Sequence, residues 1–256
     1  MTHSSQETDS RTAHITEGRA DLHMHTDASD GRPSVSELLK FVRKHRPHLN
    51  AIAITDHDTL DASLWAYERN HFYPFDIIPG VEVSARTGHI LALWVTEPIP
   101  SQMTLSETVQ AIHEVGGLAI LAHPVHPFLS CHIKQGIRTL RQPSVLEYMG
   151  FDGVEIHNAG IAGTGFNWLA RRLARTISLA VTGGSDAHTL GAIGTGETTF
   201  AGRSADDLRH ALLQQSTQAK GTPWSITDYV GYLKHERKRK AMISSGITNS
   251  STPINP

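Results

Sequence analysis

Short apolar segments that end in a histidine or a carboxylate and are followed by a helix recur along most of this chain. The segment 51–54 runs into His57, and the segment 118–122 runs into His123. Apolar strands that alternate with helices form a mainly parallel sheet that is covered on both faces. In a closed β/α barrel the C-terminal ends of the strands meet at one rim. We therefore expect an α/β fold of barrel type, with these polar side chains gathered at that rim.

The expected strands are separated by recognisable helix starts. Ser34 to Glu37 is a capping box that opens a helix ending near His45, and Thr104 to Glu107 is a second one. Further helices are expected near residues 59–70 and 205–215. The expected strands are 20–25, 51–54, 77–83, 88–95, 118–122, 153–156 and 178–181.

One connection is too short for a helical crossover. Only a few residues separate Glu82 from Gly88, which favours a β-hairpin. The strand after the turn then runs back, so His89 at its start should lie on the same rim as Glu82.

The two ends of the chain differ in character from the middle. Residues 1–19 are polar and are expected to form a disordered tail. Residues 20–221 form the expected catalytic domain, and residues 222–256 form a C-terminal arm or helix with a tail. The arm contains KHERKRK at 234–240, which is most often a solvated face.

Composition narrows the class of protein. The 256 residues carry a formal net charge of −2, which argues against a large basic surface for nucleic acid. The single cysteine, Cys131, excludes a disulfide framework and a zinc finger. The chain has neither an apolar segment of membrane-spanning length nor the apolar core of a secretory signal, so we expect a cytoplasmic protein.

Seventeen histidines are many for this length, and those at strand ends are candidate metal ligands. His23 and His25 are two residues apart in a strand, so both rings point to the same face and can hold one cation. Asp30 follows in the loop before Gly31, from which its carboxylate can reach the rim. Asp56 and His57 end the next strand, and one of the two should be a ligand.

The later strands supply the remaining candidates. Glu82 lies in an apolar segment, where a buried carboxylate needs a partner such as a bridging cation. His123 precedes Pro124 at a strand end. Asp186 and His188 follow two glycines, which allow the backbone to approach a ligand closely.

Several segments of the chain resemble, in order, the motifs of the PHP (polymerase and histidinol phosphatase) superfamily. These segments are DLHMH at 21–25, SDG at 29–31, TDHD at 55–58, GVE at 80–82, GHI at 88–90, AHP at 122–124 and GSDAH at 184–188. The resemblance extends from about residue 20 to about residue 221. It implies a distorted (β/α)7 barrel with the active site at the C-terminal rim, and a trinuclear centre of Mn, Fe or Zn.

The resemblance also implies which residues hold each cation. One cation would take His23, His25, Glu82 and Asp186; a second would share Glu82 and add His89 and His123; a third would take Asp30, His57 and His188. All nine positions carry residues able to bind a metal. The cofactors expected are therefore two or three divalent metal ions.

The chemistry expected from such a centre is hydrolysis. Two cations that share a water lower its pKa towards neutrality, so a metal-bound hydroxide would be the nucleophile, and no catalytic side chain is assigned. Arg86, in the turn before His89, is a candidate for binding phosphate. His126 and His157 are further candidates for substrate binding, and Arg32 is a weaker one.

Three functions remain open from the sequence. The first is a phosphoesterase acting on a small phosphorylated metabolite or nucleotide, with no membrane partner and no nucleic acid beyond a short oligonucleotide. Only 33 residues separate His89 from His123, whereas several nucleotide-specific members of the family carry an inserted subdomain there. The second is a hydrolase of carbamate, ester or amide bonds, and the third is a non-catalytic metal-binding module. The natural substrate, the metal and the oligomeric state stay undetermined.

Overall fold

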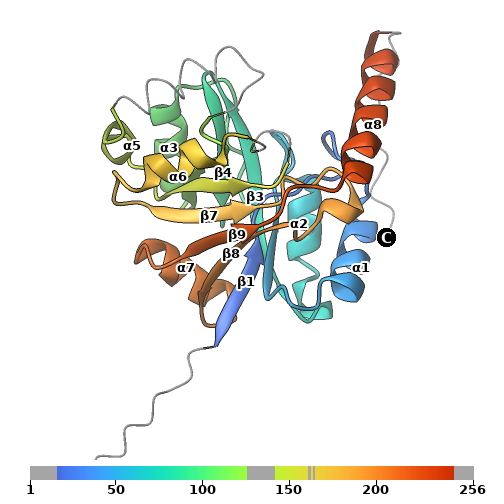
Figure 1. Cartoon of the computed structure of the whole chain (residues 1–256), viewed down its shortest axis with the longest axis horizontal. Helices are drawn as coiled ribbons and strands as arrows, with labels where there is room; N and C mark the ends of the chain where they lie inside the picture. The colour runs from blue at the N-terminus through green and yellow to red at the C-terminus, as the bar shows by residue number, and fades with distance from the viewer. Residues whose placement is uncertain (1–15, 126–141, 161–162, 164, 245–256) are drawn as a thin grey trace, which may run out of the picture.

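The computed structural model describes residues 16–125, 142–160, 163 and 165–244. Within these residues the strands form one sheet in the order β7-β6-β5-β4-β3-β2-β1-β8-β9, which curls into a nearly closed barrel (Figure 1). The strands are β1 (Glu17–Asp21), β2 (Ala51–Ile54), β3 (Asp76–Ala85), β4 (Gly88–Leu93), β5 (Leu118–Leu121), β6 (Gly153–Asn158), β7 (Ala180–Gly184), β8 (Gly196–Ala201) and β9 (Gln218–Gly221).

The helices lie outside the barrel wall (Figure 1). They are α1 (Val35–His45), α2 (Asp61–Tyr67), α3 (Leu105–Glu114), α5 (Val145–Tyr148), α6 (Asn167–Ala174), α7 (Ala205–Leu213) and α8 (Ile226–Ser244), with short 3-10 turns η1 (Asn70–Phe72) and η2 (Leu190–Ala192). Both expected capping boxes are present, at Ser34 with Glu37 and at Thr104 with Glu107. Reciprocal side-chain and backbone bonds therefore fix where α1 and α3 begin.

Strand directions place the expected ligands on one rim. β1, β2 and β3 are mutually parallel, as are β5, β6 and β7, while β4 runs antiparallel between the two groups. The predicted hairpin is confirmed: Ser84 pairs with His89 beside the turn. The C-terminal end of β3 and the start of β4 therefore lie at the same edge.

Side chains help to close the barrel where β7, at one end of the strand order, meets β8 and β9 at the other end. β8 pairs antiparallel with β1, and β9 pairs with β8; neither strand was predicted. The buried Thr198 hydroxyl accepts from the Gly183 N–H at 3.0 Å and donates to the Gly183 carbonyl at 2.9 Å. The Thr217 hydroxyl donates to the Val181 carbonyl at 2.7 Å. These bonds join β8 and the start of β9 to β7, where the backbone ladder is interrupted.

The observed bounds of β1 and β6 change the position of residues that the prediction assigned elsewhere. Residues 17–19, assigned to the disordered tail, belong to β1 and pair with residues 199–201 of β8. β1 then ends at Asp21, so His23 and His25 lie beyond it, with Met24 forming a single bridge to Ala187. β6 continues through Asn158, so His157 lies within a strand and not after one.

The helix predicted in the C-terminal arm is present, but its first turns are packed on the barrel. Trp224, just before α8, is buried and donates from Nε1 to the Ser185 carbonyl at 2.7 Å. Tyr229 and Tyr232 pack against the hydrophobic core. Residues on the two sides of position 221 therefore pack together.

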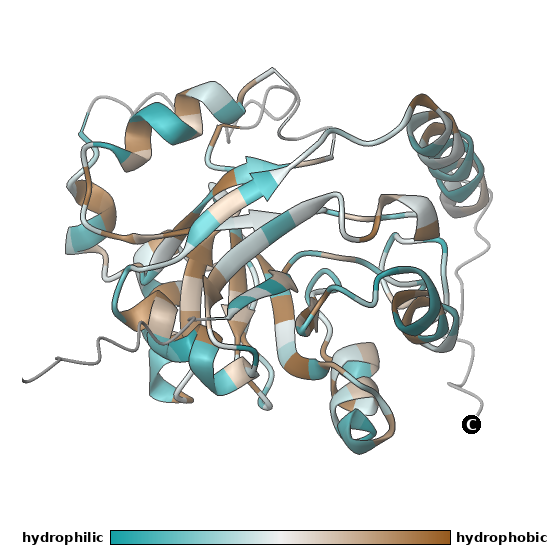
Figure 2. Cartoon of the chain, turned by 60° about the horizontal axis from the view of Figure 1, so that its bottom comes forward, coloured by the Kyte–Doolittle hydropathy of each residue, from teal (hydrophilic) through white to brown (hydrophobic). Residues whose placement is uncertain are grey.

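The strands provide the apolar interior of the barrel and the layer beneath the helices (Figure 2). All four residues of β2 and of β5 are buried, as expected for strands covered on both faces. None of the helices in the described part of the chain combines the length and the hydrophobicity needed to span a bilayer.

Closure of the barrel gives a stability prediction. Replacing Thr198 with valine keeps the shape but leaves the buried Gly183 N–H without its side-chain acceptor, so we expect a loss of about 1–3 kcal/mol in unfolding free energy. Urea unfolding would measure it. Thr222→Val, at an exposed threonine, is the control and should change stability by less than about 0.5 kcal/mol. Equal stabilities of the two variants would contradict a role of Thr198 in closure.

Candidate metal centre

The nine side chains expected to bind metal come together at one end of the barrel. They form four overlapping groups: His25, Asp30, His57 and His188; His23, Glu82 and His123; His23, His25 and Asp186; and His57, Glu82 and His89. Within each group the potential ligand atoms lie within 4.8 Å of one another. Residues separated by up to 165 positions in the sequence thus share one small volume, because the strands before them converge on one rim.

The carboxylate of Glu82 lies at the centre of this arrangement and is almost completely buried. Its two oxygens face five imidazoles: Oε2 lies 3.0 Å from His23 Nε2, 3.2 Å from His25 Nε2 and 3.5 Å from His57 Nδ1, while Oε1 lies 2.9 Å from His89 Nδ1 and 3.0 Å from His123 Nε2. A carboxylate shared in this way is suited to bridging cations.

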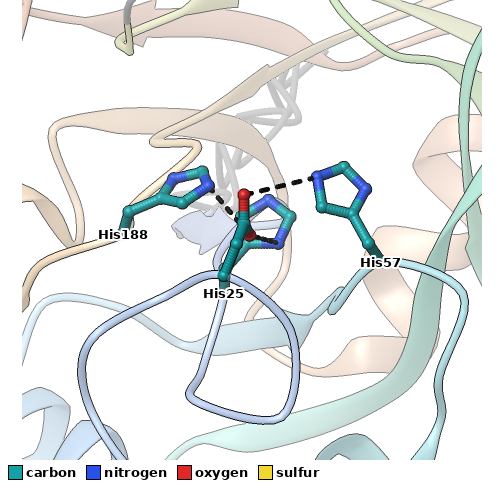
Figure 3. Close-up of side chains that lie close together, drawn as sticks. His25, His57 and His188 are labelled. Carbon is teal, nitrogen blue, oxygen red and sulfur yellow. Dashed lines mark ion pairs between the residues drawn. The ribbon is translucent and has the colours of Figure 1, made fainter. Parts of the chain in front are cut away.

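Asp30 forms the centre of a second group, whose His25, His57 and His188 rings are labelled in Figure 3. Its Oδ1 lies 3.1 Å from His188 Nε2 and 3.7 Å from His25 Nδ1, and its Oδ2 lies 3.9 Å from His57 Nε2. Figure 3 shows the three labelled imidazoles arranged around this carboxylate. The loop does bring Asp30 over the rim, as the sequence suggested.

Asp56 holds the loop in place and is not part of the cluster. Its carboxylate accepts from the Thr26 N–H at 2.7 Å, the Thr26 hydroxyl at 2.6 Å and the Ser29 hydroxyl at 2.6 Å. His57, the next residue, points into the cluster. Of the two neighbours that the sequence left as alternative ligands, His57 therefore lies in the cluster and Asp56 does not.

Two of the nine residues have unusual backbone conformations. His123 and Asp186 have φ angles of 26° and 50°, in the left-handed region that non-glycine residues seldom adopt. Both lie where the chain leaves a strand and turns across the rim. Strain of this kind concentrates at functional sites, where surrounding contacts enforce it.

Glu155 is a supporting residue that the sequence analysis missed. It is buried in β6; its Oε1 lies 3.0 Å from His23 Nδ1, and its Oε2 accepts from the His123 N–H at 2.9 Å. Asn158 Nδ2 donates to the same oxygen at 3.0 Å and to Asp186 Oδ2 at 3.2 Å. A glutamate inside an apolar strand is the signal that identified Glu82, and it applied here as well.

The carboxylates strongly perturb the imidazoles. Burial by itself would lower the pKa of His23, but Glu82, Asp186 and Glu155 outweigh it and raise that pKa well above its ordinary value. For His25, contacts with Asp186 and Glu82 likewise outweigh burial and raise the pKa to about 10. Conversely, the surrounding histidines outweigh burial and lower the pKa of Glu82 well below its usual range.

The donor set fits divalent cations. Both ring nitrogens of the buried His25 lack a hydrogen bond of good geometry, although carboxylate oxygens lie at 3.2, 3.3 and 3.7 Å. Buried polar atoms without partners are costly, and a cation among them would satisfy the nitrogens and oxygens together. Imidazole and carboxylate ligation suits Zn, Fe and Mn alike.

The residues expected to bind substrate have contacts of their own in the structure. The exposed Arg86 guanidinium donates from Nε to the Gln102 carbonyl at 2.9 Å. His157 contacts Arg171, with Nδ1 3.1 Å from Nη2, and packs against Gly221. His126 lies outside the described residues. Arg32 lies next to the cluster, since its N–H donates to the His188 carbonyl at 3.0 Å.

Comparison with known proteins gives related sequences. The family described as PHP-associated matches residues 164–217. An uncharacterized protein of Methanocaldococcus jannaschii is 30% identical over 152 residues, which cover 55% of this chain and 82% of the relative. A 5'-3' exoribonuclease of Haemophilus influenzae is 33% identical over 102 residues, 37% of this chain and 35% of that enzyme.

A solved structure shares the fold. A two-domain protein from Bacteroides vulgatus, described as containing a "predicted PHP-like metal-dependent phosphoesterase", superimposes with a TM-score of 0.60 at 18% identity, covering 81% of this chain and 65% of the other. The barrel, the order of the motifs, the convergence of the nine residues and these similarities agree. The chain belongs to the PHP superfamily.

Proposed function

We propose that the protein is a metal-dependent hydrolase that cleaves phosphate esters of small metabolites or nucleotides. The observation that carries this proposal is the set of four interlocking groups of six imidazoles and three carboxylates, which overlap at His23, His25, His57 and Glu82. A non-catalytic module of this fold has no need to keep every ligand position competent, and here all nine are filled.

The residues of this chain would hold the cations as follows. His23, His25, Glu82 and Asp186 would hold one, Glu82 with His89 and His123 a second, and Asp30, His57 and His188 a third. Bound there, divalent cations would supply Lewis-acid activation of water and neutralise charge on the phosphoryl oxygens. The Bacteroides protein, described as containing a PHP-like metal-dependent phosphoesterase, shares the fold that would carry such a centre.

The chain's own groups orient this donor set. The contact between Glu155 and His23 Nδ1 leaves His23 Nε2 facing Glu82, so the ring is fixed in the orientation that a metal ligand needs. Asp56 fixes the loop that carries Asp30. Serine and cysteine nucleophiles are absent from the nine positions, so in this proposal water attacks the ester.

Phosphate is the favoured electrophile for two reasons. The Bacteroides protein is described as a phosphoesterase, and the Haemophilus relative is an exoribonuclease, whose substrate is a phosphodiester. Several cations in one site also suit a group with multiple anionic oxygens better than a neutral carbonyl.

A panel of p-nitrophenyl phosphate, bis-p-nitrophenyl phosphate and p-nitrophenyl carbamates tests whether the enzyme hydrolyses phosphate esters. Turnover of the carbamates alone would refute the phosphoesterase proposal.

Glu82 is expected to be essential for both metal and activity. Glu82→Gln removes the shared charge among five imidazoles, so bound metal should fall below one ion per chain, and turnover should drop by about 10³-fold or more. Metal analysis and p-nitrophenyl phosphate hydrolysis would measure both. His157→Ala, which removes a buried histidine outside the cluster, should keep its metal. Full metal content in Glu82→Gln would exclude the assigned centre.

Glu155 is expected to act through His23 and His123. In Glu155→Gln the amide presents N–H donors where Asn158 and the His123 backbone also donate, so we expect metal affinity to fall by about 10–100-fold. Competition with a chelator would measure it. Glu197→Gln is the matched control, because Glu197 is a buried glutamate that contacts a different histidine, His48, at 2.8 Å. Equal metal affinities in Glu155→Gln and Glu197→Gln would show that Glu155 does not support the metal centre.

Metal binding should release protons at neutral pH. The pKa of His25 is raised to about 10 and that of His23 well above its usual value, so without metal these rings are protonated at pH 7. Cations must displace these protons, so release should be on the order of two protons per chain, and affinity should fall as the pH decreases. Calorimetry in buffers of different ionisation enthalpy would measure the release. Binding heats that do not depend on the buffer would contradict it.

A further inference from the structure

One face of α8 lies beside the Asp30 group and has no role in the centre described above. Asp228, Tyr232, His235 and Arg239 are spaced by four, three and four residues, which aligns them along one side of a helix. All four are half-buried, whereas Arg237 and Lys238 are exposed. The helix therefore turns this side towards the barrel.

The start of this face is attached to the segment that carries His188. The Thr189 hydroxyl donates to Asp228 Oδ1 at 2.7 Å, and the Tyr232 ring meets the His188 ring edge-on with centroids 5.0 Å apart. The Trp224 ring lies 5.9 Å from His188 and 5.7 Å from Tyr232. α8 is thus fixed relative to a residue of the centre, and it rises beside the barrel above α1 (Figure 1).

The next turns bring positive charge to the same place. Arg239 lies on the same side of α8 as Tyr232, seven residues further along the helix, and is half-buried with its Nε against Glu236. Burial and then Arg32 lower the pKa of His235. The Arg32 Nη1 lies 3.2 Å from where a Cβ on Gly231 would stand. Arg32 therefore lies against the α8 face that contacts His188 through Tyr232, and Arg239 continues the same face.

Arg239 is held in a defined orientation. Its Nε donates to Glu236 Oε1 at 2.7 Å, while Lys240 Nζ lies 3.3 Å from Glu236 Oε2. Two cations thus balance the one carboxylate. The guanidinium contacts Glu236 through Nε, and its two Nη groups can donate to a ligand as a fork that matches phosphate. Next to Arg32, a cavity of about 330 Å³ lies between α1, η2 and α8.

We propose that this α8 face, through Arg239 with Arg32 and the Tyr232 hydroxyl, binds the anionic oxygens of the substrate's phosphate on the Asp30 side of the centre. The inference rests on the proposed function and adds the protein groups that recognise the phosphate. The positive charge of the two arginines attracts an anion. The basic helix of the C-terminal arm is then part of the active site.

The test is binding of inorganic phosphate to the metal-loaded full chain, measured by calorimetry, with metal content and the KM and kcat for p-nitrophenyl phosphate measured alongside. Arg239→Ala should weaken phosphate binding and raise KM by about tenfold or more, with unchanged metal content and a smaller change in kcat. Arg239→Lys, which keeps the charge without the fork, should lie between Arg239→Ala and the wild type.

Arg237→Ala is the matched control, because Arg237 is the same residue type on the opposite, exposed side of α8. It should leave phosphate affinity within about twofold. Phosphate affinity in Arg239→Ala and Arg239→Lys equal to that of the wild type would overturn the inference, even if the wild type hydrolyses phosphate esters. Wild-type protein that binds phosphate through Arg239 but hydrolyses no phosphate ester would instead overturn the proposed function and leave this binding site standing.

Discussion

The burial of one carboxylate, that of Glu82, governs the architecture of the rim. A glutamate with almost no solvent exposure must be paired, and here five imidazoles from different parts of the chain supply the pairing. Four separate segments of the chain have to deliver those histidines, since His23 and His25 share one. The barrel, the hairpin after β3 and the turn at His123 are the means by which the chain meets that requirement.

Around this central contact lies a set of buried groups that orient the ligands. Glu155 reaches both His23 and the backbone of His123, and Asn158 links Glu155 to Asp186. Asp56 fixes the loop that carries Asp30. A metal site whose ligands are held in this way loses little freedom when a cation binds, since the rings are already oriented.

The rim is asymmetric, and this asymmetry shapes the proposed chemistry. On the Asp30 side, Trp224 and Tyr232 pack against His188, and α8 continues past them with cationic residues. The C-terminal segment therefore contributes to the environment of the centre, although its charge pattern resembles that of an ordinary solvated helix. Packing of Trp224 on Ser185 explains why the helix stays beside the barrel.

The sequence by itself determined the barrel class, the hairpin and the nine residues of the cluster, because strand ends, capping boxes and ordered motifs are local features. Only the tertiary structure decided between Asp56 and His57, showed Glu155 beside His23, and revealed β8 and β9 as the closing strands. It also showed what Arg86 and His157 contact and brought Tyr232 of α8 against His188. These outcomes depend on which distant surfaces meet, and a side chain's direction across a barrel is set by packing that a local pattern does not contain.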